Sequence, residues 1–174
     1  HMNELIQDLN LSFRLEGSNF PLEMENRDVV ELVRRTVADV ASAPWANGYH
    51  LTLEAVESRL DMRIDPKLFQ RALRNLLVNS IIHNPKGTRI RVTLQKHTDV
   101  EITIEDNGKG MDEETVEHLF QKYYRGTSTD AISEGTGLGM AVAQQLISAH
   151  NGLIHVKSRV NEGTTLQILF PLSN

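Results

Sequence analysis

Three glycines alternate with other residues in Glu134-Gly-Thr-Gly-Leu-Gly-Met140, where a polar, Thr/Ser-rich stretch gives way to an apolar helical pattern. Glycine permits positive φ angles and lets a ligand approach the backbone without a Cβ in the way. A helix that begins here presents free N–H groups and a partial positive charge, which suit a phosphate. The segment therefore indicates either a phosphate-binding site or a flexible hinge, and its own residues leave both interpretations open.

A second group of polar side chains lies on one face of an expected helix, since Asn75, Asn79 and His83 follow one another at intervals of four residues. Asparagine is a poor residue for the interior of a helix, so two of them on one face need an explanation. They are either solvated or locally bonded amides, or one of them supplies an oxygen to Mg²⁺. One neutral protein ligand is sufficient for Mg²⁺, because this ion keeps several waters and binds substrate phosphates.

Two further segments carry charged groups that could meet a ligand. Asp106-Asn-Gly-Lys-Gly110 follows an expected strand, where the aspartate could accept a hydrogen bond from an exocyclic amine. Asp-Asn-Gly also favours an ordinary β-turn, and these residues alone favour the turn. In Phe120-Gln-Lys-Tyr-Tyr-Arg125, the two cations are either surface charges or groups that reach a terminal phosphate. The aperiodic span that follows, residues 126–135, is typical of a functional lid.

These polar groups must be positioned by secondary structure, and the hydrophobic periodicity predicts several helices. A helical tail covers residues 3–15. The next helix begins after Asp28, which together with Glu31 resembles a capping box, and it stops before Pro44. The strongest helical pattern begins at Asp65-Pro66, with aspartate as the cap and proline at the first helical position. Its apolar stripe contains Phe69, Ala72, Leu73, Leu76, Leu77 and Ser80. Two more helices are expected over residues 112–121 and 137–150.

Alternating apolar residues predict six strands, several of them joined by short polar turns. Helices combined with a run of hairpins favour a two-layer α/β sandwich with a mixed, largely antiparallel sheet. The expected strands cover residues 50–55, 60–64, 89–95, 100–105, 153–158 and 165–170.

Composition bounds the class of protein. The 174 residues suffice for one domain, with 40% hydrophobic and 24% charged residues, an ordinary balance for a chain that buries a core. A formal charge of −5 argues against nonspecific binding to nucleic acid. The absence of cysteine excludes disulfides and thiolate metal sites. No apolar run approaches the ~18 residues of a transmembrane helix.

The motifs, in their order, resemble the ATP-binding catalytic domain of bacterial sensor histidine kinases, in the GHKL superfamily shared with gyrase, MutL and Hsp90. Leu73-Arg-Asn-Leu-Leu-Val-Asn-Ser80 resembles the N box, Asp106-Asn-Gly-Lys-Gly110 the first glycine box, and Phe120 to Arg125 the F box. Gly135-Thr-Gly-Leu-Gly139 resembles the second glycine box, and Gly163-Thr-Thr165 the last turn of the fold. The resemblance covers essentially the whole chain. It implies an α+β two-layer sandwich, with about three helices on one face of the mixed sheet.

The resemblance also implies roles for individual residues. Asn79 would coordinate Mg²⁺, Asn75 would lie against the phosphates, and Asp106 would bind the amine of adenine. Arg125 would approach the γ-phosphate as the catalytic residue. The cofactor-binding residues implied for ATP are Asn75, Asn79, His83, Asp106, Gly108, Gly110, Lys122, Gly135, Thr136, Gly137, Leu138, Gly139 and Thr165.

One position departs from the family pattern. Members commonly have lysine three residues after the second asparagine, and this chain has Ile82. A contact to phosphate is therefore expected to be missing, or to come from Lys122 or Lys86.

The residue four positions before the Mg²⁺ asparagine indicates the class of reaction. Members of the superfamily that hydrolyse ATP typically have glutamate there, as a general base one helical turn from the metal ligand. Asn75 cannot take up a proton, which favours phosphoryl transfer to a separate acceptor over rapid hydrolysis. The alternatives are a degenerate nucleotide-binding regulatory module and a clamp-type ATPase.

The resemblance implies that the acceptor is a histidine on an upstream dimerisation domain, from which the phosphoryl group passes to a response regulator. His1-Met2 resemble residues left by cloning, residues 3–18 the end of the dimerisation helix and its linker, and residues 19–174 the catalytic domain. We expect most of the histidines in this chain to be surface residues. We also expect a monomeric fragment from the cytoplasmic part of a membrane-anchored sensor.

Overall fold

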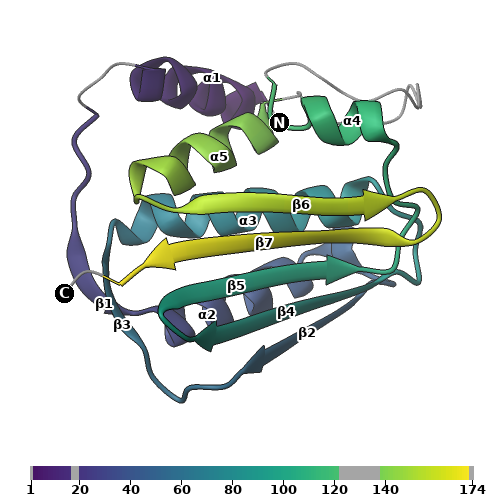
Figure 1. Ribbon diagram of the computed structural model, residues 1–174. Helices are drawn as coiled ribbons and strands as arrows, with labels where there is room; N and C mark the ends of the chain where they lie inside the picture. Colours follow the sequence, from purple (N-terminus) through teal and green to yellow (C-terminus); the bar gives the residue numbers. More distant parts are fainter. Residues whose placement is uncertain (1, 17–19, 122–137, 173–174) are drawn as a thin grey trace.

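The computed structural model describes residues 2–16, 20–121 and 138–172, which form two layers (Figure 1). One layer is a five-stranded sheet in the order β2-β4-β5-β7-β6. β2 and β4 run parallel, and the other neighbours run antiparallel, so the expected mixed and largely antiparallel sheet is confirmed. The strands are β2 (His50–Ala55), β4 (Arg89–Lys96), β5 (Asp99–Asp106), β6 (Leu153–Arg159) and β7 (Gly163–Pro171).

Helices α2, α3 and α5 cover one face of this sheet, which confirms the expected number (Figure 1). Helix α1 packs on α5, and the short helix α4 lies beside β6. Within the described residues, no helix combines the length and the apolar character that crossing a membrane requires. The helices are α1 (Met2–Glu16), α2 (Val29–Ala41), α3 (Pro66–Ile82), α4 (Glu113–His118) and α5 (Gly139–Ala149), with a 3₁₀ turn at Pro44–Ala46.

The core fills the space between the sheet and the helices. Every second residue of the central strands points toward the helices and is buried, as the pleat of a strand requires. The apolar stripe predicted for α3 is buried in full, and the side chain of Asp65 accepts a hydrogen bond from the N–H of Leu68 as the expected cap. The helix-facing core residues of β5 and β7 are Val100, Ile102, Ile104, Leu166, Ile168 and Phe170.

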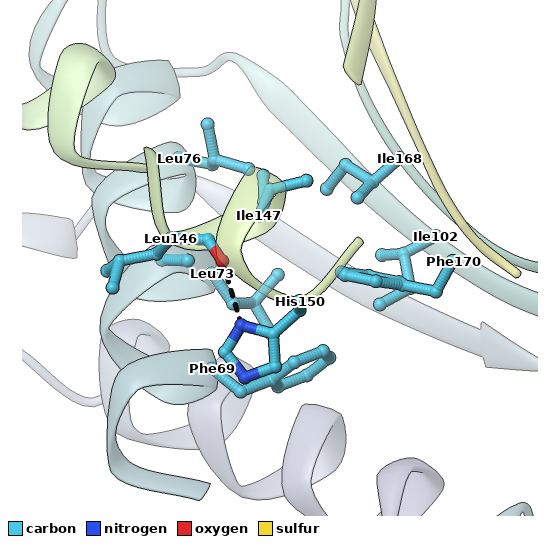
Figure 2. Close-up of a pocket in the computed structure, with 10 residues that line it drawn as sticks. Phe69, Leu73, Leu76, Ile102, Leu146, Ile147, His150, Ile168 and Phe170 are labelled. Atoms are coloured by element: carbon cyan, nitrogen blue, oxygen red, sulfur yellow. Dashed lines mark hydrogen bonds between the residues drawn. The ribbon is translucent and has the colours of Figure 1, made fainter. Parts of the chain in front are cut away.

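His150, at the end of α5, is a buried residue rather than a surface one, with 8% of its area exposed. Its Nδ1 lies 2.8 Å from the carbonyl of Leu146, which can only accept, so Nδ1 carries the proton (Figure 2). Nε2 accepts from the N–H of Asp65 at 3.1 Å. The ring also packs edge-on against Phe69. His150 therefore joins the end of α5 to the beginning of α3.

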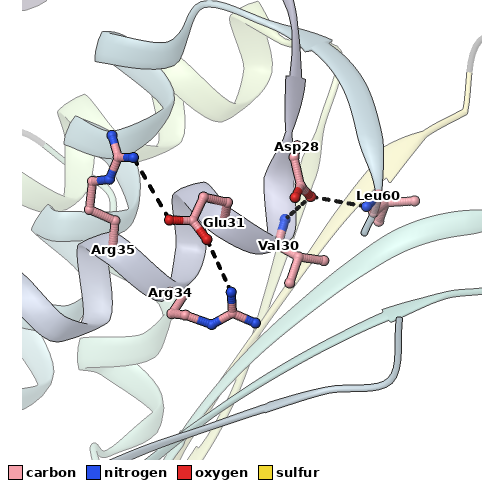
Figure 3. A network of polar contacts seen from close by, with 6 residues as sticks. All are labelled: Asp28, Val30, Glu31, Arg34, Arg35 and Leu60. Atoms are coloured by element: carbon pink, nitrogen blue, oxygen red, sulfur yellow. Dashed lines mark hydrogen bonds and ion pairs between the residues drawn. The ribbon is translucent and has the colours of Figure 1, made fainter. Parts of the chain in front are cut away.

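The start of α2 corrects one detail of the sequence interpretation (Figure 3). Asp28 caps the helix as expected, with Oδ1 accepting from the N–H groups of Val30 at 3.1 Å and Leu60 at 3.0 Å. Glu31 does not reach back to complete a capping box. It pairs with Arg34 and Arg35, one turn further along the exposed face of the helix.

Two short strands form a separate ribbon. The expected strand at residues 60–64 is β3 (Asp61–Ile64), but it does not join the main sheet. It pairs antiparallel with β1 (Glu25–Asp28), which the sequence analysis did not predict. The ribbon delivers Asp28 to the start of α2 and Asp65 to the start of α3, so it sets where both helices begin.

Candidate functional site

Three polar side chains form a row across adjacent strands at one end of the sheet. Asp106, the last residue of β5, pairs with Thr164 of β7, and Thr164 pairs with Ser158 of β6. Alternation along the strands puts this row on the helix-facing side, two residues beyond the buried Ile104 and Leu166. The carboxylate of Asp106 therefore points toward the helix layer.

Asp106 is 7% exposed, and its Oδ1 accepts from the N–H of Gly108 at 2.9 Å. That bond is the local turn that Asp-Asn-Gly favours, so the turn interpretation is confirmed, while the binding of an amine stays a prediction. Burial raises the pKa of Asp106 above its ordinary value. Hydrogen bonding from the backbones of Gly108 and Thr164 and from the Asn84 side chain opposes that rise in pKa, and the charge of Glu105 adds to it.

Asn84, just beyond α3, fixes the loop after Asp106. Its Nδ2 donates to the carbonyl of Ser80 at 2.7 Å, and its Oδ1 accepts from the N–H of Lys109 at 3.0 Å. The same side chain fills the space beside Gly108, where a Cβ would overlap it. The hydroxyl of Tyr49 donates to the carbonyl of Asn84 at 2.7 Å. The loop is thus anchored to the end of α3.

Position 110 requires glycine for two reasons, its positive φ angle and the lack of space for a Cβ. Its φ is +68°, and a Cβ at this position would overlap the carbonyl of Arg159, the last residue of β6. The carbonyl of Lys109 accepts from the N–H of Asn161 at 2.6 Å, which holds the loop against that turn.

We expect Gly110→Ala to lower the free energy of unfolding by more than about 2 kcal/mol, since a left-handed backbone costs an L-residue ~1–2 kcal/mol before any overlap. Gly87→Ala is the matched control, because Gly87 has a φ of +96° and a Cβ there meets no described atom within 4 Å. Urea unfolding measures both variants. Equal losses would contradict a role for the overlap with Arg159.

Helix α3 presents Asn75, Asn79 and His83 along one face, as their spacing predicts. Asn75 Nδ2 donates to the carbonyl of Gly139, the first residue of α5, at 3.2 Å. Asn79 is half-buried, and its amide has no hydrogen-bond partner among the side chains and backbone that the structure describes. Among the amides at this end of α3, Asn75 and Asn84 are bonded within the fold, whereas no described residue bonds the Asn79 side-chain oxygen.

His83 is half-buried at the last turn of α3. Burial lowers the pKa of its imidazole, and the positive charge of Lys109 lowers that pKa further. The ring is therefore neutral near pH 7, and it adds no charge to the site. Lys109, by contrast, is an exposed cation close to His83.

The other predicted residues fall into three groups. Gly139 begins α5 and is half-buried, while the side chain of Leu138 is fully buried, so only the Leu138 backbone could face a ligand. Thr165 lies on the opposite face of β7, between Glu105 and Lys157, so the threonine beside Asp106 is Thr164. Lys122, Arg125, Gly135, Thr136 and Gly137 lie outside the described residues.

Sequence reasoning missed three residues of this site. Thr164 could have been found by extending the strand alternation back from Leu166, which puts it two residues away on the same face. Ser158 follows in the same way from its position opposite Thr164. Asn84 lies after the end of α3, where helical periodicity no longer applies, and no local signal marks its contact with the loop.

Comparison with known proteins identifies the family of this chain. Residues 64–174 match the family model described as histidine kinase-, DNA gyrase B- and HSP90-like ATPase. The sensor histidine kinase YvrG of Bacillus subtilis (strain 168) is 43% identical over 171 residues, which is 98% of this chain and 30% of that protein. Signal transduction histidine-protein kinase AfsQ2 of Streptomyces coelicolor is 25% identical over 98% of this chain and 30% of its own length. The chain thus spans about 30% of these curated relatives.

Solved structures give the same result. The mycobacterial sensor histidine kinase MprB matches with a TM-score of 0.74 and 25% identity, over 84% of this chain and 97% of that chain. Full-length ShkA in complex with AMPPNP matches with a TM-score of 0.85 over 100% of this chain and 36% of that chain. At 18% identity, this structural match shows a shared fold alone. With a family model that spans most of its length, the chain belongs to the histidine kinase-, DNA gyrase B- and HSP90-like ATPase family.

Proposed function

We propose that this chain is the catalytic domain of a sensor histidine kinase, which binds Mg·ATP and donates the γ-phosphoryl group to a histidine outside the chain. The observation that carries the proposal is that two polar groups suited to a nucleotide, one at the end of β5 and one on α3, belong to the two layers of the fold. The inward carboxylate of Asp106 lies at the end of the sheet, and the uncommitted amide of Asn79 lies on α3. The carboxylate suits a base with an exocyclic amine, and the amide oxygen suits a metal bound to phosphates.

We assign a role to each predicted site residue at the base and the metal that the structure describes. Asp106 accepts from the amine of adenine. The Cβ positions of Gly108 and Gly110 face Asn84 and the carbonyl of Arg159, so these glycines shape the loop beside the base rather than expose its backbone to the base. The neutral ring of His83 lies beside the nucleotide. Asn79 holds Mg²⁺, which when bound neutralises charge on the phosphates as these transfers require.

The phosphate end of the site is assigned to the segment before α5. Arg125 would contact the γ-phosphate, with Lys122 as a second cation, and the glycine run through Gly139 would seat the phosphates. The bond from Asn75 to the carbonyl of Gly139 supports this arrangement, because it fixes the first turn of α5 against α3. The free N–H groups of that turn are suited to an anion.

The amide at Asn75 supports transfer of the phosphoryl group to a separate acceptor over hydrolysis of ATP. An amide cannot take a proton from water, and the Nδ2 of Asn75 is already engaged with Gly139. A clamp-type ATPase would need a base at this position. Steady release of phosphate by the chain would revive that alternative.

The proposed partners are the dimerisation domain of the same protein and a response regulator, in the cytoplasmic part of a membrane-anchored sensor. We assign residues 3–18 to the end of the dimerisation helix and its linker. The contact of α1 with α5 is compatible with this, since Leu11 and Ser12 are buried and the Ser12 hydroxyl donates to Gln145 Oε1 at 3.2 Å.

We expect the isolated chain to bind Mg·ATP without labelling itself from γ-labelled ATP. Helix α1 contains no histidine, and His150 is buried with both ring nitrogens bonded. Incubation with γ-labelled ATP followed by acid and base treatment checks this. A longer version of the protein that includes the upstream helix is the control, and it should acquire an acid-labile label. Acid-labile phosphohistidine on the isolated chain would overturn the prediction.

A second candidate is a degenerate nucleotide-binding module with a regulatory role. Ile82 favours it, because it is 40% exposed where related chains commonly have a lysine for phosphate. Calorimetric titration with Mg·ATP, ADP and GTP tests the primary proposal. Binding of ATP without any phosphoryl transfer in the longer protein would favour the degenerate module instead.

A further inference from the structure

The main sheet has two edges, and they differ in charge. β2 forms one edge and β6 the other (Figure 1). The edge of a sheet offers N–H and C=O groups to another chain, and natural proteins often protect such an edge with lysine and other charges. β6 has two exposed cations, Lys157 and Arg159, which would repel one another if two copies of this edge met. β2 has no lysine or arginine, and the charged Glu54 shares a face with His50.

The free backbone groups of β2 belong to its odd-numbered residues. β2 runs parallel to β4, and the N–H groups of His50 and Val56 donate to carbonyls on that side at 3.1 and 3.0 Å. Consecutive residues of a strand direct their backbone groups to opposite sides, so the groups of Leu51, Leu53 and Ala55 point away from β4. Within residues 2–16, 20–121 and 138–172, no strand pairs with that side of β2.

We propose that β2 pairs antiparallel with β2 of a second copy of this chain, about a two-fold axis at Thr52. Free backbone groups then meet free ones, because Leu51 lies opposite Leu53 of the second copy and each such pair exchanges two hydrogen bonds. His50 lies opposite Glu54 of the second copy, and symmetry repeats this contact. An imidazole N–H can donate to a carboxylate, so the strand is complementary to itself. A reversible dimer would differ from the monomer expected from the sequence.

The side chains select one register. Among registers that keep odd-numbered residues opposite one another, only the axis at Thr52 places His50 opposite Glu54. An axis at Glu54 would bring two carboxylates together, which is unfavourable. Leu51 and Leu53 are only half-buried at this edge, and each would cover the other across the axis. Opposite residues of paired strands point to the same face, so the joined sheet would have both helix layers on one side.

Thr52→Cys tests the position of the axis, because the chain has no cysteine of its own. Opposite residues in a non-hydrogen-bonded antiparallel pair have Cα atoms about 4.5 Å apart, which a disulfide can span. Mild oxidation of this variant at about 1 mM protein should therefore give a covalent dimer. Val56→Cys is the matched control, since this position is 71% exposed and four residues from the axis. Equal cross-linking of the two variants, or none in Thr52→Cys, would overturn the proposal.

An exchange of charge tests the same register without a cross-link. Sedimentation equilibrium of the unmodified chain should show a reversible dimer with a dissociation constant of about 1 mM, as a small interface gives. Glu54→Lys should raise that constant about three- to tenfold, because both contacts with His50 are lost. His50→Glu combined with Glu54→Lys reverses the pair and should restore the constant.

Two results would contradict the proposal. A chain that stays monomeric up to about 1 mM has no such interface. A dimer that is insensitive to Glu54→Lys uses another surface, such as α1, where Ile6 is 53% exposed. Neither measurement needs a nucleotide, so the outcome is independent of the proposed function, which the titrations with ATP test separately.

Discussion

Asn79→Ala is expected to remove the Mg²⁺-dependent part of ATP binding while the protein stays folded. In titrations with and without Mg²⁺, the variant should show, under both conditions, the affinity that the unmodified chain shows without the metal. Loss of an outer-sphere partner of a metal costs about 10–100-fold in affinity, so loss of the direct ligand should cost at least about tenfold. Stability should not fall, because the Asn79 amide has no partner among the described residues and alanine is the better helix former.

Gln70→Ala is the matched control for this experiment. It removes an amide from the same helix, nine residues earlier, which is about two and a half turns away and on another face. This variant should bind Mg·ATP like the unmodified chain. Mg²⁺-dependent binding that survives Asn79→Ala would show that the metal assignment is wrong. Equal losses in the two variants would point to a general weakening of α3.

The parts of the fold with strong local signals could be predicted from the sequence. Asp65-Pro66 marks the beginning of α3, and the spacing of its apolar residues places the buried face correctly. β1 could not be predicted, because Glu25–Asp28 contains only polar residues and becomes a strand through its pairing with β3. Glu31 could not be assigned either, since a glutamate at the third position of a helix can turn back to the cap or forward to Arg34 and Arg35.

The candidate site is easier to predict where one residue type suggests the chemistry than where strand register decides which side chain faces it. The chemistry of Asp106 and Asn79 can be recognised in the sequence, and their roles in binding stay predictions. Two consecutive threonines have equal chemistry, and a shift of one position along β7 moves a side chain to the other face of the sheet. Only the register between β5 and β7 therefore shows that Thr164, and not Thr165, lies beside Asp106.

Asp106→Asn should weaken ATP binding about ten- to hundredfold, which corresponds to ~1.5–3 kcal/mol for a hydrogen bond to a charged group. An asparagine offers one acceptor oxygen, and Gly108 already donates to the Oδ1 of this side chain. Its amide nitrogen would face the amine of the base as a second donor. Glu105→Gln is the matched control. It neutralises the adjacent carboxylate, which is exposed, pairs with Arg91 at 3.2 Å and lies on the other face of the sheet.

The stability of Asp106→Asn separates a binding role from a scaffold role. Burial raises the pKa of Asp106, so the ionised carboxylate destabilises the folded state at every pH above that raised value. Asparagine carries no such penalty. Near pH 7, the free energy of unfolding of the variant should equal that of the unmodified chain or exceed it by up to about 1 kcal/mol. As the pH falls through the raised pKa toward the ordinary value, the unmodified chain should gain stability relative to the variant. Urea unfolding across that range measures the difference. If Asp106→Asn lost folding and ATP binding together, Asp106 would be acting mainly as a turn residue, and its assignment to the amine would fail.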